Sequence, residues 1–202
     1  MKIPRHFLII FLTIAIKIPG FAQCLHDSVV VTMETEDGNL RIELFTKEAP
    51  VTCANFLKYV EQVGDQGGEF YRTVTMANQP DKKIKIEVIQ GGFNLKNMDT
   101  STIKPILLER TSVTGLSHKN GTLSMARSDP DSGSTEFFIC IGDQPSLDFG
   151  GQRNPDGQGF AAFGQVIQGM DVVRKIQQMP SEGQTLTPPV RIIRVITEVK
   201  NK

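Results

Sequence analysis

Residues 29–44 have the sequence VVVTMETEDGNLRIEL, which contains two strands and the turn between them. Residues 29–34 are rich in the β-branched side chains that strands favour. The dipeptide Asp37-Gly38 is typical of a tight hairpin turn. Over residues 40–44 apolar and polar side chains alternate, so this strand has one buried face. The stretch therefore predicts an antiparallel pair that lies on a hydrophobic core.

The segments that follow the hairpin predict more strands and two helices. Pro50 suits the first turn of a helix, and apolar residues recur after it at the spacing of one helical face, at Cys53, Phe56, Leu57 and Val60. A second helix is predicted over residues 170–179. Short β-rich runs bounded by turn residues predict strands at residues 84–89, 121–126, 136–141, 160–166 and 190–199. The pattern indicates a mainly all-β fold, a barrel or a sandwich with two helices.

The overall composition is that of one folded domain. The chain has 202 residues, of which 39% are hydrophobic and 22% are charged, close to ordinary globular values. Lys plus Arg equals Asp plus Glu at 22 each, so the chain has no overall positive field for a phosphate backbone. We therefore expect no nucleic-acid partner. No repeat or linker interrupts the chain, and residues 29–202 are predicted to form a single domain.

Residues 1–22 have the pattern of a cleaved signal peptide. Lys2 and Arg5 make a basic start, and the apolar run over residues 7–16 is followed by small residues. This run is shorter than the ~20 residues that a helical span requires, so no stable membrane span is predicted. We expect cleavage after Ala22 and export, with the periplasm as the destination.

The tail that follows, residues 23–28, contains a possible lipidation site. Cys24 stands near the right place, but Gln23 before it is not the small residue that such processing requires. A lipid-anchored form is therefore the less favoured alternative.

The remaining cysteines and histidines do not predict a metal site or a disulfide framework. Cys53 and Cys140 lie inside apolar patterns and are expected to be buried, and His26 and His118 are isolated. The chain also lacks the G-x-S-x-G, Walker, H-E-x-x-H and helix-opening G-x-G-x-x-G motifs, which disfavours hydrolase, kinase and dehydrogenase functions.

Several short motifs occur in an order that is typical of one family. They are Phe70-Tyr71-Arg72, Gln90-Gly91-Gly92, Gly121-Thr122-Leu123-Ser124-Met125-Ala126, Glu136-Phe137-Phe138-Ile139, Leu147-Asp148 and Phe163-Gly164. Over residues 28–200 the chain thereby resembles the cyclophilin-type peptidyl-prolyl cis-trans isomerases. Residues 151–160 are most similar to bacterial members that carry an export signal. The resemblance implies a closed eight-stranded antiparallel barrel capped by two helices, with the substrate groove on its outer surface.

The resemblance also implies which residues act on the prolyl bond. Arg72 matches the catalytic arginine, whose planar and permanently charged guanidinium would donate to the prolyl nitrogen as the amide twists. Gln90 matches the glutamine that hydrogen-bonds the substrate backbone. Phe138 matches the aromatic floor of the proline pocket, with Leu147 as a wall. Because neighbouring strand residues face opposite sides, Phe137 is expected to point into the barrel.

Five further residues are expected to contact the substrate. Val88 stands where the family usually has methionine, and Phe160 stands where many members have histidine. Ala126 matches a groove position that accommodates the residue before proline. Arg127 replaces a frequent asparagine, and Glu136 replaces a glutamine.

The chain departs from the family pattern next to this groove. Glu87 falls where a pocket phenylalanine is common, and Ser146 takes the place of an aromatic residue. Residues 73–87 form a longer stretch than in compact members. We expect this insertion to change which side chains approach Arg72.

The leading functional hypothesis is a peptidyl-prolyl isomerase that assists the folding of exported proteins. Its partners would be proline-containing segments of unfolded or exported proteins, and it would work as a monomer without metal or organic cofactor. One alternative is a proline-directed binding module or holdase with little turnover, which the presence of both Arg72 and Gln90 disfavours. Another is a lipocalin-type barrel with an internal ligand cavity, which the two closing helices disfavour.

Overall fold

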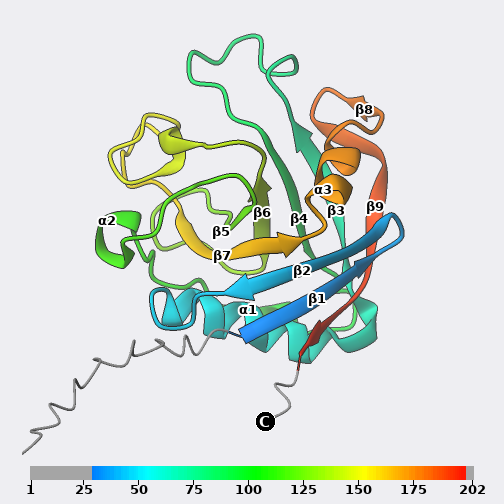
Figure 1. Cartoon of the computed structure of the whole chain (residues 1–202). Helices are drawn as coiled ribbons and strands as arrows, with labels where there is room; N and C mark the ends of the chain where they lie inside the picture. The colour runs from blue at the N-terminus through cyan, green and yellow to red at the C-terminus, as the bar shows by residue number, and fades with distance from the viewer. Residues whose placement is uncertain (1–28, 199–202) are drawn as a thin grey trace, which may run out of the picture.

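The computed structural model describes residues 29–198, which form one barrel of strands with helices at its ends (Figure 1). The predicted signal peptide 1–22 and the tail 23–28 lie outside the described residues. None of the helices within residues 29–198 combines the length and the hydropathy that a bilayer span requires.

The strands form a closed antiparallel ring, as the eight-stranded prediction requires. Around the ring the order is β1-β2-β7-β5-β6-β4-β3-β9, and β9 pairs back onto β1. Closure leaves no open sheet edge in the ring. The strands are β1 Val29–Thr35, β2 Gly38–Leu44, β3 Gly68–Val74, β4 Val88–Phe93, β5 Thr122–Met125, β6 Glu136–Cys140, β7 Ala161–Gln168 and β9 Thr185–Thr197, while β8 Ser181–Glu182 is a short addition paired with β9.

Two helices close the ends of the barrel, as predicted. α1 (Pro50–Val63) lies below the hairpin of β1 and β2 in Figure 1, and α3 (Met170–Gln177) lies above it. α1 buries Phe56 and Tyr59, and α3 buries Val173 and Ile176. A one-turn helix, α2 (Thr111–Thr114), and three 3-10 turns, η1 Gly64–Gln66, η2 Thr100–Thr102 and η3 Pro145–Leu147, were not predicted.

The interior of the barrel is filled by aromatic rings. The ring centroid of Phe56 lies 5.2 Å from that of Phe93, 5.5 Å from that of Phe137 and 5.4 Å from that of Phe163. Phe137 is fully buried in this core, which confirms that it points inward. The lipocalin-type alternative expected a ligand cavity here, where the structure has packed side chains.

The predicted strand at residues 84–89 was wrong in its first half. β4 begins at Val88 and continues through Gly91 to Phe93. Residue Ile86 cannot pair with a strand because the buried Gln79 side chain occupies its backbone, donating to its carbonyl at 2.7 Å and accepting from its N–H at 3.3 Å. Apolar character at residues 84–86 therefore indicates packing rather than strand pairing.

β9 begins earlier than the predicted residue 190 because two prolines obscure its first part. Pro188 and Pro189 have no N–H to donate to a sheet. The pairing with β3 passes over them, from Val190 opposite Phe70 to Thr185 opposite Arg72. β9 thus continues through Pro188 and Pro189, although two adjacent prolines in a sequence normally indicate that a strand is interrupted.

Candidate active site

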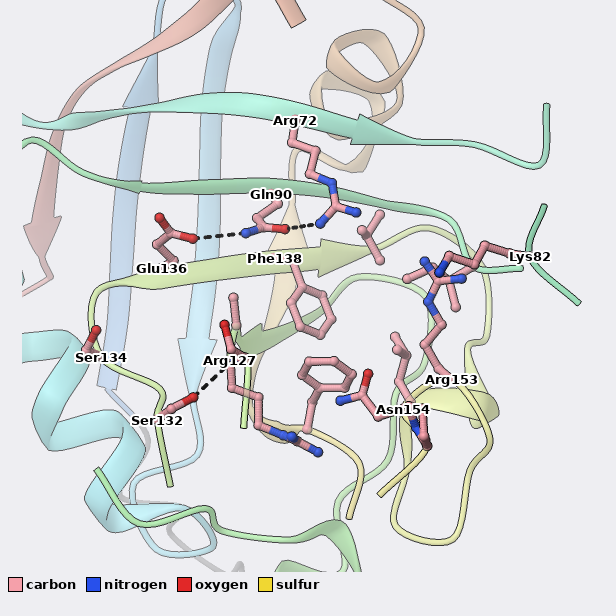
Figure 2. Close-up of a pocket in the computed structure, with 17 residues that line it drawn as sticks. Arg72, Lys82, Gln90, Arg127, Ser132, Ser134, Glu136, Phe138, Arg153 and Asn154 are labelled. Atoms are coloured by element: carbon pink, nitrogen blue, oxygen red, sulfur yellow. Dashed lines mark hydrogen bonds between the residues drawn. The ribbon is translucent and has the colours of Figure 1, made fainter. Parts of the chain in front are cut away.

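A pocket of about 670 Å³ on the outside of the barrel brings together every predicted site residue. Figure 2 shows it beside strands β3, β4 and β6. The predicted residues that line it are Arg72, Val88, Gln90, Ala126, Arg127, Glu136, Phe138, Leu147 and Phe160. The lining residues that the sequence analysis missed are Lys82, Ile86, Ser128, Ser132, Ser134, Arg153, Asn154 and Pro155.

A bulge in β3 turns Arg72 toward this pocket. Phe70 is fully buried and pairs with Gly91, whereas Arg72 pairs with Gln90, the next residue along β4. Tyr71 is therefore the extra residue of a β-bulge. With strict alternation Arg72 would share the inward face of Phe70. The bulge reverses this and places the guanidinium outside.

Arg72 and Gln90 form the centre of a hydrogen-bonded network. Arg72 Nη1 donates to Gln90 Oε1 at 2.7 Å. Gln90 Nε2 donates to the Tyr71 hydroxyl at 2.6 Å and to Glu136 Oε2 at 3.0 Å. The carboxylate of Glu136 also accepts from the Tyr71 hydroxyl at 2.6 Å. A cation at its oxygen and an anion at its nitrogen thus fix the orientation of the Gln90 amide (Figure 2).

Tyr71 remains protonated in this network. Burial, followed by the hydrogen bond to Glu136, raises the pKa of the Tyr71 phenol well above its ordinary value. The hydroxyl is therefore a donor to Glu136 and an acceptor from Gln90 at neutral pH. This role was missed because Tyr71 was considered only as a neighbour of Arg72 in the motif.

Gln184 is a second anchor for Arg72, and the sequence analysis did not single it out. Its Oε1 accepts from Arg72 Nη2 at 2.6 Å and from Nε at 3.0 Å. Gln184 lies in the turn between β8 and β9, and its Nε2 donates to the backbone carbonyl of Asn78 at 3.1 Å. The guanidinium is therefore held by Gln90 on one side and by Gln184 on the other, and Arg72 still lines the pocket.

The floor of the pocket is apolar. Phe138 is 5% exposed and meets the ring of Phe160 edge to face, at 5.3 Å between centroids. Val88, Leu147 and the unpredicted Ile86 belong to the same cluster of buried side chains. This arrangement places an apolar surface in the same pocket as the guanidinium of Arg72.

A buried polar chain supports the floor from below. His118 stacks under Phe138 at 6.0 Å between ring centroids, its Nδ1 lies 2.7 Å from Asp148 Oδ1, and its Nε2 lies 2.9 Å from Ser124 Oγ. The order Asp-His-Ser resembles a hydrolytic triad, but Ser124 is fully buried and its hydroxyl donates to the Ala161 carbonyl. The three residues therefore hold Phe138 in place.

Arg127 lines the pocket, yet its guanidinium is engaged elsewhere. Nη1 and Nη2 form a bidentate pair with Asp156 at 2.7 and 2.9 Å, and Nε donates to the Gly159 carbonyl. The cation lies 5.1 Å from the centroid of the Phe160 ring. The hydrogen bond from Arg127 lowers the pKa of Asp156. Arg127 thus braces the loop that carries Phe160.

Two residues of the insertion at residues 73–87, Lys82 and Ile86, line the pocket. Glu87 does not line it, because its side chain accepts from Gln177 Nε2 at 3.3 Å on the side of α3. Ile86 supplies the apolar contact instead. Ser146 lines a neighbouring hollow rather than the pocket.

Neither cysteine of the described residues lines the pocket. Cys53 and Cys140 are buried free thiols, as predicted. Burial raises the pKa of the Cys53 thiol to about 12. Between residues 29 and 198, no group of three or more His, Cys, Asp and Glu side chains is placed to hold a metal ion.

Comparison with known proteins agrees with this architecture. Residues 30–197 match the family described as "Cyclophilin type peptidyl-prolyl cis-trans isomerase/CLD". A peptidyl-prolyl cis-trans isomerase of Acinetobacter baylyi is 34% identical over 91% of this chain and 93% of its own. Peptidyl-prolyl cis-trans isomerase B of Escherichia coli is 34% identical over 73% of this chain and 84% of its own.

A solved structure has the same fold at lower sequence identity. The crystal structure of a Cryptosporidium parvum cyclophilin-type isomerase superimposes with a TM-score of 0.67 at 20% identity, and it covers 86% of this chain and 99% of its own. The closed barrel, the pocket on its outer face and the match over residues 30–197 lead to one assignment. The chain belongs to the family of cyclophilin-type peptidyl-prolyl cis-trans isomerases.

Proposed function

We propose that this protein accelerates rotation about X-Pro peptide bonds in exported proteins by binding the twisted amide more tightly than either planar form. The observation that carries the proposal is the position of Arg72. Its guanidinium is fixed by Gln90 and Gln184 beside an apolar floor formed by Phe138. A charged donor next to a proline-sized apolar surface fits a proline whose ring nitrogen is losing conjugation.

The chemistry requires stabilisation of a rotation and no covalent step. Amide resonance gives the bond a barrier of roughly 18–20 kcal/mol. Each ~1.4 kcal/mol of preferential binding to the twisted amide increases the rate about tenfold. A ten-thousandfold acceleration therefore needs about 5.5 kcal/mol, which one charged hydrogen bond, one neutral hydrogen bond and a dry pocket supply together.

Each residue has a separate task in this mechanism. Phe138 and Leu147 grip the proline ring, which fixes one side of the rotating bond. Arg72 donates to the prolyl nitrogen as that nitrogen becomes pyramidal and gains a lone pair. Gln90 Nε2 donates to a substrate carbonyl in exchange for its bond to Tyr71 or Glu136. The Arg72–Gln90 bond couples these two donors.

The decisive experiment is NMR exchange spectroscopy on a proline-containing tetrapeptide with the purified protein. We expect fast cis-trans exchange with the natural protein and loss of at least a hundredfold in rate with Arg72→Ala. The matched control is Arg191→Ala, because Arg191 is exposed on β9 away from the pocket. Circular dichroism establishes that each variant is folded.

The same measurement separates the enzyme from the binding-module alternative. A natural protein that binds the peptide without accelerating exchange would be a proline-directed binding module or holdase. Acceleration that survives Arg72→Ala would show that Arg72 is not the catalytic donor.

Export to the periplasm belongs to the same proposal, and the N-terminal sequence supports it. The mass of the protein recovered from the periplasmic fraction of an expressing bacterium tests it. A chain that starts at Gln23 is the expected result. An added lipid mass on Cys24 would identify the anchored form instead, and an intact Met1 start in the cytoplasm would overturn export.

Size-exclusion chromatography with light scattering tests the proposed monomer.

A further inference from the structure

The pocket carries more positive charge than the chain as a whole. Its charged lining residues are Arg72, Lys82, Arg127, Glu136 and Arg153, four basic and one acidic, whereas the chain has 22 basic and 22 acidic residues. Asp156 neutralises Arg127 through the bidentate pair. The unbalanced charge therefore comes from Arg72, Lys82 and Arg153.

The charges are separated along the pocket. Glu136 lies at one side with Gln90, and Lys82 and Arg153 lie at the opposite side (Figure 2). Phe138 stands between the two sides. A peptide whose proline sits on Phe138 thus meets an anion in one direction and two cations in the other.

Lys82 and Arg153 sit on ordered loops that are tied to each other. Arg153 Nη1 donates to the Ile84 carbonyl at 2.7 Å, which joins the loop after η3 to the insertion. Within the insertion, the buried Gln79 side chain donates to the carbonyls of Thr75 and Ile86, both at 2.7 Å. The two cations are therefore presented by a built wall of the pocket.

These two cations also have unused donors. Within residues 29–198 the Lys82 ammonium has no hydrogen-bonded or ionic partner, and the structure shows one hydrogen bond from the Arg153 guanidinium, which has five N–H groups. Burial, and then the charge of Arg72, lowers the pKa of Arg153. The positive groups on this side of the pocket therefore lack a neighbouring carboxylate among the described lining residues. Asp81 directly precedes Lys82 in the chain, but it does not line the pocket. An incoming carboxylate would relieve this repulsion.

The direction of the substrate follows from Ala126. The residue before proline is expected beside Ala126. The Ala126 N–H donates to the Glu136 carbonyl at 2.9 Å, and Glu136 lies on the side of Phe138 away from Lys82 and Arg153 (Figure 2). The chain after proline therefore leaves over the cationic wall.

We propose that Lys82 and Arg153 are specificity-determining residues that bind an Asp or Glu side chain located one to three residues after the substrate proline. This substrate class rests on the proposed isomerase function of the same pocket. The insertion, which supplies Lys82, is then the element that selects acidic segments.

The test compares hexapeptides that differ only at the second residue after proline, which is Glu, Gln or Lys. Both kcat/KM from NMR exchange and Kd from chemical-shift titration are measured. At low salt we expect the Glu peptide to have about fivefold higher kcat/KM and about fivefold lower Kd than the Gln peptide. The Lys peptide should have lower kcat/KM and higher Kd than the Gln peptide. At about 1 M salt the Debye length is near 3 Å, so the differences should largely vanish.

Charge reversal assigns the effect to the wall. In Lys82→Glu the preference should invert toward the Lys peptide, whereas the matched control Lys83→Glu should keep the Glu preference, because Lys83 lines the neighbouring hollow. Equal values for the three peptides, or a stronger effect of Glu placed before proline, would overturn the inference. Loss of exchange with all peptides would refute the isomerase proposal alone, since the Kd ratios still test the charge preference.

Discussion

Arg72 and Gln184 are separated by 112 positions in the chain, yet their side chains are hydrogen-bonded. Two nitrogens of the Arg72 guanidinium donate to Gln184, and the third donates to Gln90. Two neutral amide oxygens orient the cation without cancelling its charge. A carboxylate in either place would form an ion pair and weaken what Arg72 offers to a twisted amide. Glutamine at both positions therefore leaves the positive charge of Arg72 uncancelled, as the proposed mechanism requires.

Removing Gln184 should mainly lower kcat, the rate of rotation about the bound X-Pro bond. Gln184→Ala deletes the acceptor of two Arg72 donors, and we expect kcat to fall about tenfold, in line with the ~1.5 kcal/mol of a charge-assisted hydrogen bond. Gln184→Glu should restore the geometry but recover only part of kcat, because the added charge pairs with Arg72. NMR exchange at saturating peptide measures this. Gln168→Ala, an exposed change on β7, is the control. An unchanged kcat in Gln184→Ala would exclude this positioning role.

Arg127 should act on the loop after η3 rather than on the substrate directly. Arg127→Lys keeps the charge but loses the planar fork that pairs with Asp156. We expect about tenfold faster amide hydrogen exchange at Gly157 and Gln158, since this fork is worth ~1.5 kcal/mol or more.

A second substitution tests whether the pair itself is responsible. Asp156→Asn should raise the rate of hydrogen exchange at the same amides. The control is Arg194→Lys, which alters the ion pair between Arg194 on β9 and Glu34 on β1 and should leave these exchange rates unchanged. Protected loop amides in Arg127→Lys would show that the loop is held by other contacts.

β3 illustrates what a single extra residue does to an element. Phe70 faces the core, Tyr71 and Arg72 both reach the network outside, and Thr73 returns inward to donate to the Gln177 carbonyl at 2.8 Å. The alternation of a strand is therefore lost at the place where β3 supplies the proposed catalytic residue, Arg72. The bulge aims two polar groups at the pocket and keeps the barrel wall continuous.

The insertion before β4 depends on one buried side chain. Gln79 is 2% exposed and bonds to backbone atoms of Thr75 and Ile86. Gln79→Ala would leave these groups without partners, at a cost of about 1–3 kcal/mol in the free energy of unfolding. Urea unfolding measures the loss, and hydrogen exchange should locate it in residues 75–87. Lys83→Ala, an exposed change in the same loop, should have little effect. A stable, protected loop without Gln79 would contradict this account.

The sequence predicted the elements that rest on local periodicity and missed those that rest on distant contacts. α1 and the first hairpin follow from spacing and turn chemistry, so both were confirmed. β3 was missed because its bulge breaks the alternation. Lys82 lies in the insertion and Arg153 in residues 151–160, and the sequence drew attention to both stretches. These two residues and Gln184 were still missed, because their place in the site depends on contacts that only the closed fold creates.

The resemblance supplied a different kind of information. It placed Arg72, Gln90 and Phe138 in one site although they lie on three strands, and the structure brings them together. It did not anticipate that Arg127 would be tied to Asp156, because Arg127 stands where the family frequently has asparagine, which cannot form an ion pair.

At the scale of the molecule, the charged residues around the seam between β1 and β9 help to close the barrel. Glu198, just after β9, accepts from Arg41 at 2.7 and 2.8 Å and from Thr32 at 2.8 Å. The hydrogen bond from Arg41, followed by that from Thr32, lowers the pKa of Glu198 from an ordinary value of 4.5 to about 2. The ionised carboxylate therefore fastens the seam.

This shift gives the stability of the seam a defined pH dependence. Because the pKa is lower in the folded state, the contribution of Glu198 is present above pH 4.5 and is lost as the pH falls toward 2. We expect Glu198→Gln to have a slightly lower urea midpoint than the natural protein at pH 7, and the gap to close between pH 4.5 and 2. Glu61→Gln, an exposed change on α1, is the control. A gap that persists at pH 2 would rule out ionisation as the cause.

The strand that completes the ring is also the last of the ring's strands, within the described residues, to be synthesised. β9 lies between β3 and β1, and Gln184 immediately precedes it. A chain that emerges N-terminus first has open edges on both β1 and β3, and no second acceptor for Arg72, until residues 184–197 appear. During translation the pocket thus acquires its finished geometry only once β9 has been made, and a chain that stops before Gln184 lacks both closure and the second acceptor of Arg72.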